Sequence, residues 1–274
     1  MEINTIHLLV SFDKNYIGPF QVLLQSLVAS NPQETFHIWL LHSAIPAEDL
    51  RELEAFCAAR YATLTPVAVD RTMFESAPVS QQYPQEMYYR LLAHLLLPDS
   101  LERILYLDPD ILVINSVRSL WELSLGDRAF AAASHSGVFE IINDVNRVRL
   151  KKQHDYYNTG VLLMDLAKAR EAVNAEEIFN CVREQSEKLL LPDQDVFNLL
   201  YGSLTFQLDD SIWNYDARYF SAYLLKSDGQ YTMDWVMENT VFLHFCGRQK
   251  PWKITHLGRF AALYKHYMNL AKIG

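Results

Sequence analysis

Short apolar segments alternate with helical patterns through the first 70 residues, and this alternation constrains the fold more than any other feature. Residues 6–12 have the continuous apolar character of a buried strand. Apolar residues then recur at helical spacing over 18–31. Further strand-like segments at 36–41 and 64–69 flank a second helical pattern at 46–60. This order of strands and helices predicts an α/β protein with a parallel sheet and helices on its faces.

Strand and helix patterns also alternate in the rest of the chain, but less regularly. Helices are predicted at 85–97, 175–190 and from about 256 to 271, and strands at 103–107, 129–133, 160–164 and 241–245. No internal repeat, low-complexity segment or linker interrupts these elements. We therefore expect residues 1–274 to form a single domain with irregular additions and a C-terminal helix from about residue 256.

Charge and cysteine content exclude several classes of protein. The formal net charge is −9 and the chain has no basic run, which disfavours a nucleic-acid partner. The three cysteines, Cys57, Cys181 and Cys246, are odd in number and lack C-x-x-C spacing, so we expect a reducing cytoplasm and no disulfide framework. Neither a cationic signal sequence nor an apolar run near 18 residues is present, so no signal peptide or transmembrane helix is expected.

Asp108-Pro109-Asp110 follows a predicted strand and is a candidate metal site. In an extended chain, residues i and i+2 point to the same side, so the two carboxylates converge. Two such groups repel unless a cation or a proton lies between them, and Mg²⁺ or Mn²⁺ prefers these oxygen ligands. The alternative is a surface turn with solvated acids.

His244 ends the last predicted strand and precedes Gly247 and Lys250. A lone histidine at such a place is commonly a hydrogen-bonded core residue. Gly247 permits close approach of the backbone to a ligand, and Lys250 supplies a charge suited to phosphate. These neighbours favour a binding role.

Two further segments are ambiguous. Residues 13–16 follow the first strand, where α/β folds often bind a nucleotide, but they also suit a helix-capping turn. Residues 193–195 read most simply as a helix N-terminus with acids placed against the dipole. The nine glycines contain no G-x-G or G-x-x-x-x-G-K pattern, which disfavours Rossmann dehydrogenases and P-loop enzymes.

Nine segments, in order along the chain, form a recognisable set. They are SFDKNY at 11–16, YYRL at 88–91, RILYLDPD at 103–110, WEL at 121–123, YNTGVLLMDL at 157–166, DQD at 193–195, WN at 213–214, HFCG at 244–247 and KPW at 250–252. Each segment alone is weak evidence, but the ordered set spans nearly the whole chain. Taken together, the segments resemble glycosyltransferase family 8, which includes bacterial lipopolysaccharide galactosyl- and glucosyltransferases and glycogenin.

The resemblance implies a GT-A fold, in which a mostly parallel central sheet flanked by helices binds a UDP-sugar and a divalent metal, usually Mn²⁺ and otherwise Mg²⁺. It implies that Asp108, Asp110 and His244 coordinate the metal, which bridges the donor diphosphate, so that Asp108 also serves the donor. For the other donor contacts it implies Asp13, Asn15 and Tyr16 for uridine, Gly247 and Lys250 for the diphosphate, and Arg90, Asn158, Asp193 and Gln194 for the sugar.

The function implied is a metal-dependent, retaining transfer of glucose or galactose from UDP to a saccharide or glycolipid acceptor such as lipopolysaccharide. Gln194 occupies the sugar-facing position and is a poor nucleophile, so we favour a front-face displacement with the leaving phosphate as base. Asp195 is a less favoured nucleophile beside Asp193 and Gln194. The alternatives are a catalytically silent UDP-sugar-binding regulatory protein and a phosphohydrolase built on Asp108 and Asp110, which would lack its expected threonine.

Departures from the family pattern leave some properties open. Relatives often carry an aspartate where this chain has Ser134-His135-Ser136, so the donor hexose is not specified. The chain ends at Gly274 without a basic aromatic tail, so at most peripheral membrane contact is expected, with a cytoplasmic location that includes the inner face of the membrane. Residues 72–87 and 213–223 are candidates for acceptor contact, with core packing as the alternative. The oligomeric state is not indicated.

Overall fold

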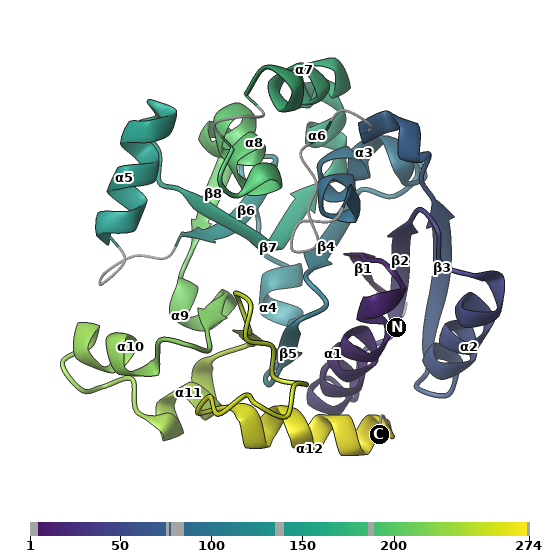
Figure 1. Ribbon diagram of the computed structural model, residues 1–274, viewed down its shortest axis with the longest axis vertical. Coiled ribbons are helices and arrows are strands. Elements are labelled where there is room, and N and C mark those ends of the chain that lie inside the picture. The colour runs from purple at the N-terminus through teal and green to yellow at the C-terminus, as the bar shows by residue number, and fades with distance from the viewer. Residues whose placement is uncertain (1–4, 75–76, 78–84, 135–139, 186–188, 273–274) are drawn as a thin grey trace.

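The computed structural model describes residues 5–74, 77, 85–134, 140–185 and 189–272 (Figure 1). Its main sheet has seven strands in the order β3-β2-β1-β4-β7-β6-β8, and a smaller sheet has the order β5-β10-β9. The strands are β1 Ile6–Ser11, β2 Phe36–His42, β3 Ala62–Ala68, β4 Arg103–Leu107, β5 Ile111–Val113, β6 Phe130–Ser134, β7 Tyr157–Asp165, β8 Thr205–Leu208, β9 Tyr215–Asp216 and β10 Phe242–His244.

Only β7 runs against its neighbours, β4 and β6, in the described part of the main sheet. All other neighbouring strands there pair in parallel. The α-helices are α1 Ile17–Ser30, α2 Ala47–Ala58, α3 Ala93–Leu96, α4 Arg118–Trp121, α5 Glu140–Leu150, α6 Leu166–Ala172, α7 Ala175–Gln185, α8 Pro192–Tyr201, α9 Asp210–Trp213, α10 Phe220–Lys226, α11 Met233–Asn239 and α12 Ala261–Ala271. The expectation of a mostly parallel sheet flanked by helices is confirmed.

Alternation of side chains along the strands gives the main sheet two apolar faces. In β4, Leu105 and Leu107 pack in the cluster that contains α1 and α2. Ile104 and Tyr106 point the other way, into the cluster that contains α6, α7 and α8. Because β4 is buried on both faces, its sequence is a continuous apolar run, and the same reason explains the runs in β1 and β7.

Two predicted helices differ from the structure. The segment expected to be helical over 85–97 is a 3-10 helix, Gln85–Leu92, followed by the single turn of α3. Its residues 88–92 are all buried, so no solvent face exists to favour a regular amphipathic helix. The last helix begins at Ala261 rather than near 256, because successive turns at Lys253–His256 and Gly258–Ala261 come first.

A third apolar cluster lies between the smaller sheet and helices α1, α10, α11 and α12. Most of the aromatic stretch 213–223 belongs to it. Tyr215 stacks on Tyr223 with ring centroids 4.1 Å apart, and both rings are buried with Phe220. Core packing is therefore the correct interpretation for these three rings. Most of the other acceptor candidate, 72–87, lies outside the described residues.

No helix in the described ranges is both long enough and apolar enough to cross a bilayer.

Substitution of a residue in the central strand β7 tests the core. Leu163→Ala removes a fully buried side chain, and we expect the free energy of unfolding to fall by about 2–5 kcal/mol. Leu225→Ala, at a side chain that is 75% exposed, is the matched control and should change it by about 0.5 kcal/mol or less. Urea denaturation measures both values, and equal effects would contradict the assigned burial.

Candidate functional site

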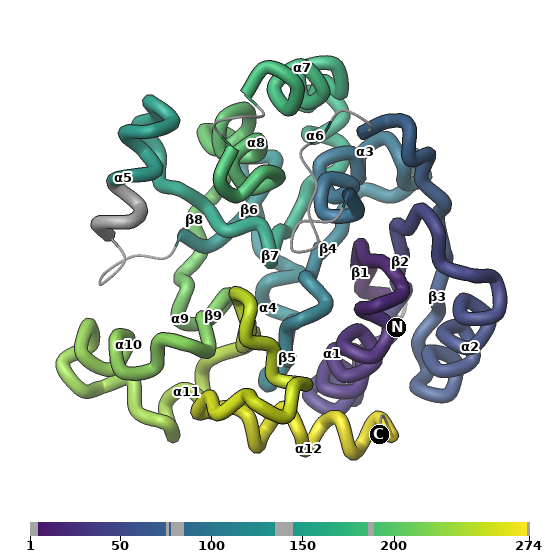
Figure 2. The backbone as a smooth tube through the Cα atoms, viewed as in Figure 1, coloured from purple at the N-terminus to yellow at the C-terminus, as the bar shows by residue number. Residues whose placement is uncertain are grey.

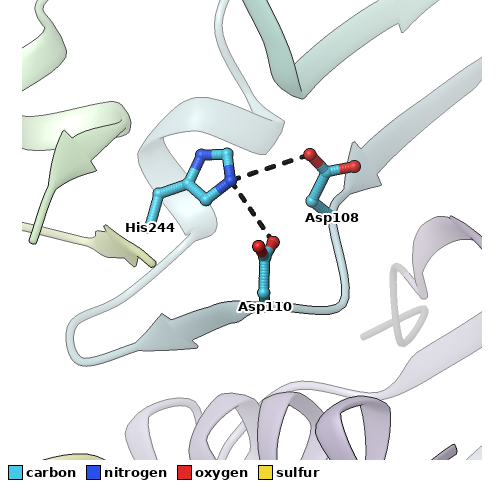
Figure 3. A group of neighbouring side chains, drawn as sticks. All are labelled: Asp108, Asp110 and His244. Atoms are coloured by element: carbon cyan, nitrogen blue, oxygen red, sulfur yellow. Dashed lines mark ion pairs between the residues drawn. The ribbon is translucent and has the colours of Figure 1, made fainter. Parts of the chain in front are cut away.

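Asp108, Asp110 and His244 converge where the main sheet meets the smaller one (Figure 3). Asp108 directly follows β4, Asp110 directly precedes β5, and His244 is the last residue of β10, which pairs antiparallel with β5. Their potential ligand atoms all lie within 4.8 Å of one another. The His244 Nε2 atom is 3.3 Å from Asp110 Oδ1 and 3.7 Å from Asp108 Oδ2. Asp110 and His244, which are 134 positions apart in the sequence, thus lie in one cluster with Asp108.

Asp108 is held through one carboxylate oxygen and presents the other to the cluster. Its Oδ1 atom accepts a hydrogen bond of 2.6 Å from the Tyr106 hydroxyl and pairs with Arg90 Nη2 at 2.9 Å. The Oδ2 atom faces His244. The carboxylate is oriented before any ligand arrives.

Asp110 is held in the same way by a different cation. Its Oδ2 atom pairs with Lys250 Nζ, while Oδ1 faces His244. Burial alone would raise the pKa of Asp110, but Lys250 and His244 together hold it below the ordinary value. The carboxylate is therefore ionised although it is only 6% exposed.

The imidazole of His244 is oriented by an amide. Nδ1 donates to Asn214 Oδ1 at 2.8 Å, which turns Nε2 towards the two acids. Burial lowers the pKa of His244, but Cys246 and Asp110 raise it well above the ordinary value. A cation bound among these residues would compete with the proton on Nε2, so its affinity should decline with falling pH.

A string of amides leads from this imidazole to α8. Asn214 Nδ2 donates to Asn158 Oδ1 at 2.8 Å, and Asn158 Nδ2 donates to Gln194 Oε1 at 3.1 Å. Asn158 Oδ1 also accepts from the backbone N–H of Gly160. The orientation of Gln194 is thereby coupled to that of His244.

The residues present fit a divalent cation. Two carboxylate oxygens and one imidazole nitrogen suit Mn²⁺, and the oxygens also suit Mg²⁺. Gly160 keeps the space clear, because a Cβ there would lie 2.3 Å from His244 Cε1 and 2.8 Å from Asp108 Oδ2. Only glycine permits β7 to pass this close to the cluster.

Arg90 joins Asp108 to Asp193 in a second buried group. Arg90 Nε is 3.3 Å from Asp193 Oδ2, and Arg90 Nη1 donates to the Thr159 carbonyl at 2.8 Å. Thr159 Oγ1 also donates to Asp193 at 3.1 Å. Desolvation raises the pKa of Asp193 to about 6, since the opposing effect of Arg90 is smaller and Asp108 adds repulsion.

Asp195 lies apart from this group although it is two residues from Asp193. Its fully buried carboxylate accepts hydrogen bonds from Arg149, Tyr156 and the backbone N–H groups of Leu190 and Leu191. Both oxygens are occupied, so the geometry fits a residue that positions the start of α8. The expected helix N-terminus at 193–195 is confirmed, with Pro192 at the first position.

The segment after β1 lies close enough to the cluster for Lys250, Asp110 and Asp108 to act electrostatically on Tyr16. Asp13 caps the short helix Lys14–Tyr16 by accepting from Asn15 N at 2.9 Å, as the capping interpretation predicted. Tyr16 packs edge-on against Trp252 at 5.7 Å, and burial raises its pKa, with Lys250 acting in the opposite direction.

Asn214 and Arg218 received no individual role from the sequence, only a place in the acceptor candidate 213–223. Asn214 belongs to the Trp-Asn pair that carried the resemblance, which was the available signal. Arg218 had no signal: buried Asp216 holds its guanidinium bidentately, and its Nη1 atom would lie 2.7 Å from a Cβ at Gly247. Gly247 itself has φ of +82°, which favours glycine. Ser134 is buried, and His135 and Ser136 lie outside the described residues.

Comparisons with known proteins agree with this arrangement. The sequence pattern described as glycosyl transferase family 8 matches residues 7–256. General stress protein A of Bacillus subtilis strain 168 is 26% identical, over 97% of this chain and 94% of that protein. Lipopolysaccharide 1,2-glucosyltransferase of Escherichia coli is also 26% identical, over 92% and 74%. The crystal structure of the galactosyltransferase LgtC with donor and acceptor sugar analogues matches with a TM-score of 0.81 at 21% identity, over 97% and 96%. The expected GT-A fold is confirmed.

Gly160→Ala tests whether the cluster needs the space that glycine leaves. We expect at least a tenfold loss of Mn²⁺ affinity, measured by isothermal titration calorimetry, because the added methyl group displaces His244 or Asp108. Gly126→Ala is the control, since nothing lies within 4 Å of a Cβ there, although its φ of +55° imposes a small stability cost. Unchanged Mn²⁺ binding by Gly160→Ala would contradict the site.

Asp193→Asn tests the electrostatics of the second group. The pKa of Asp193 is about 6 in the folded protein and lower when unfolded, so the wild type loses stability as pH rises through that interval. In metal-free protein, the stability of the variant relative to wild type should therefore increase by about 2 kcal/mol between pH 4 and pH 7.5, because part of the effect lies below pH 4, where the unfolded carboxyl already ionises. Urea titrations at both pH values measure the change. A difference that is independent of pH would show that Asp193 is not perturbed.

Proposed function

This chain belongs to glycosyl transferase family 8, and from that premise we propose that it is a metal-dependent retaining hexosyltransferase. It moves glucose or galactose from a UDP-sugar to a saccharide or glycolipid acceptor, such as a lipopolysaccharide, in the cytoplasm. The observation that carries the proposal is the convergence of Asp108, Asp110 and His244 beside the buried cation Arg90 and the partly buried cation Lys250. The name of the glucosyltransferase relative supports a glycolipid acceptor.

The donor lies across the edge of the sheet in this proposal. Asp13, Asn15 and Tyr16 bind uridine, and the placement of Tyr16 beside Trp252 and the 250–252 segment supports this. Asp108, Asp110 and His244 hold Mn²⁺ or Mg²⁺, which when bound offsets the charge of the donor diphosphate. The backbone at Gly247 approaches the diphosphate closely, as its positive φ permits.

Lys250 contributes charge stabilisation during bond breaking. The bond between the anomeric carbon and the phosphate oxygen breaks with its electron pair on the diphosphate, whose negative charge grows. A fixed ammonium group beside that oxygen stabilises the transition state more than the ground state. Asp110 and the carbonyl of Phe245 hold the Lys250 ammonium in place for this role.

Arg90, Asn158, Asp193 and Gln194 orient the hexose. Arg90 and Asp193 offer it a charged, buried hydrogen-bonding pair, and the amide string fixes Asn158 and Gln194. An amide oxygen is a poor nucleophile, and the occupied carboxylate of Asp195 makes that residue a positioning group. These contacts favour front-face displacement. The acceptor oxygen bonds to the anomeric carbon, and its proton passes to the departing phosphate oxygen.

A second candidate is a catalytically silent UDP-sugar-binding regulatory protein. The observation that favours it is the similarity to general stress protein A, whose name states no transfer activity. The two candidates share the metal and uridine residues, so binding alone does not separate them. Release of UDP from a UDP-sugar does, because only the enzyme breaks the sugar–phosphate bond.

Asp110→Ala tests the proposed enzyme. With UDP-glucose or UDP-galactose and Mn²⁺, we expect the rate of UDP release to fall by at least about 100-fold, because one of three metal contacts and the partner of Lys250 are lost. Asp70→Ala, at an exposed acid outside the cluster, is the matched control, and circular dichroism checks the fold. Full activity in the Asp110 variant or in excess chelator would refute the metal-dependent enzyme. Wild type that binds donor without releasing UDP would support the silent protein.

A further inference from the structure

Charge is distributed unevenly along this acidic chain. Residues 239–274 contain six basic side chains and no acidic one, whereas residues 1–238 contain 18 basic and 33 acidic side chains, a net charge of −15. The C-terminal part therefore carries +6 within a protein of net charge −9. Such segregation gives one part of the surface an attraction for anions that the whole protein lacks.

Two aliphatic side chains within this basic part are almost completely exposed. Ile254 is 96% exposed and Leu257 is 94% exposed, the two highest values among the large hydrophobic residues of the described chain. Both lie in the loop 253–259, where Lys253 and Arg259 are also exposed. We call this segment the basic aliphatic loop; in Figure 2 it is part of the yellow tube that leads into α12.

The basic aliphatic loop is held in place by buried groups at both ends. Pro251 is buried, and Lys265 Nζ donates to the Trp252 carbonyl at 3.3 Å. At the other end Phe260 is 2% exposed. Backbone hydrogen bonds from His256 N to Lys253 O and from Ala261 N to Gly258 O form turns within it. The loop thus has a defined conformation that presents its apolar side chains to solvent.

We propose that the basic aliphatic loop docks this protein on an anionic phospholipid surface. Ile254 and Leu257 enter the interface, where burial of apolar area is favourable, while Lys253 and Arg259 meet the lipid phosphates. The positive charge of this part favours a lipid surface over a neutral or cationic protein partner. A single loop of this size gives reversible, peripheral attachment, which needs no spanning helix.

The position of the basic aliphatic loop links this attachment to the site. Lys253 N donates to the carbonyl of Lys250, the residue that pairs with Asp110. Arg259 lies over the ring of Phe220, whose helix follows Arg218 beside Gly247. A membrane bound at the loop would therefore lie next to the cluster, where a glycolipid acceptor could reach it without leaving the bilayer.

Vesicle cosedimentation of the full chain tests the docking surface. The assay contains neither donor nor metal, so its result is independent of the proposed function. Wild type should bind phosphatidylcholine vesicles containing about one third phosphatidylglycerol at least about tenfold more tightly than pure phosphatidylcholine vesicles, with loss at high salt. Ile254→Ser with Leu257→Ser should lower binding about tenfold or more. Adding Lys253→Glu to this double variant should weaken binding to the anionic vesicles further, and should leave binding to the pure phosphatidylcholine vesicles unchanged.

Val145→Ser with Val148→Ser is the matched control, because these residues form another exposed aliphatic pair three residues apart, on α5. It should bind vesicles as wild type does, and thermal unfolding should show that both double variants fold. The proposal is overturned if wild type does not prefer anionic vesicles, or if the Ile254/Leu257 variant binds as wild type does. It is also overturned if that variant instead abolishes self-association of a dimer, measured by analytical ultracentrifugation, which would assign the loop to a second copy of the chain.

Discussion

The structure depends on keeping two carboxylates and an imidazole close together inside the protein. Asp108 and Asp110 would repel each other if nothing balanced their charge, and burial makes that repulsion stronger. Arg90 balances the first acid and Lys250 the second, each through the oxygen that faces away from His244. The cluster therefore exists with one oxygen of each acid directed at a common volume, and a divalent cation needs little rearrangement to enter it.

The junction of the two sheets supplies this geometry. The chain leaves β4 in the main sheet, passes through Asp108 and Asp110, and enters β5 in the smaller sheet, where β10 delivers His244. On the other side β7 approaches the cluster closely because Gly160 has no side chain. The antiparallel placement of β7 brings Asn158 and Thr159 to the same edge, so the cluster of Asp108, Asp110 and His244 and the Arg90–Asp193 group are parts of one site.

Sequence patterns predicted the elements that are decided by local physics. The strands β1, β2 and β4 are continuous apolar runs because both faces of the main sheet are covered. Asp13 and Pro192 were predictable as helix starts, because a capping side chain and a proline at the first helical position act within the same turn of the helix. The 3-10 conformation of Gln85–Leu92 was missed because tertiary burial of all its later residues overrides helical preference.

The candidate site was predictable from the sequence only as separate pieces. Spacing within 108–110 indicated paired carboxylates, but their meeting with His244 depends on the pairing of β5 with β10, which no local pattern specifies. Family resemblance supplied that link. The separation of Asp193 from Asp195 follows from the turn of α8, which directs one acid to Arg90 and the other to Arg149. Asn214 and Arg218 act through contacts with residues about 30 positions away, which spacing does not reveal.

The central claim is that one cation binds among Asp108, Asp110 and His244, and crystallography measures it most directly. Crystals grown with UDP and Mn²⁺ should show a single anomalous peak for manganese, with oxygen ligands from both acids and His244 Nε2 at about 2.0–2.3 Å. The diphosphate of UDP should complete the coordination beside Lys250. An anomalous peak elsewhere, or UDP bound at this edge with none of the three side chains contacting manganese, would contradict the account.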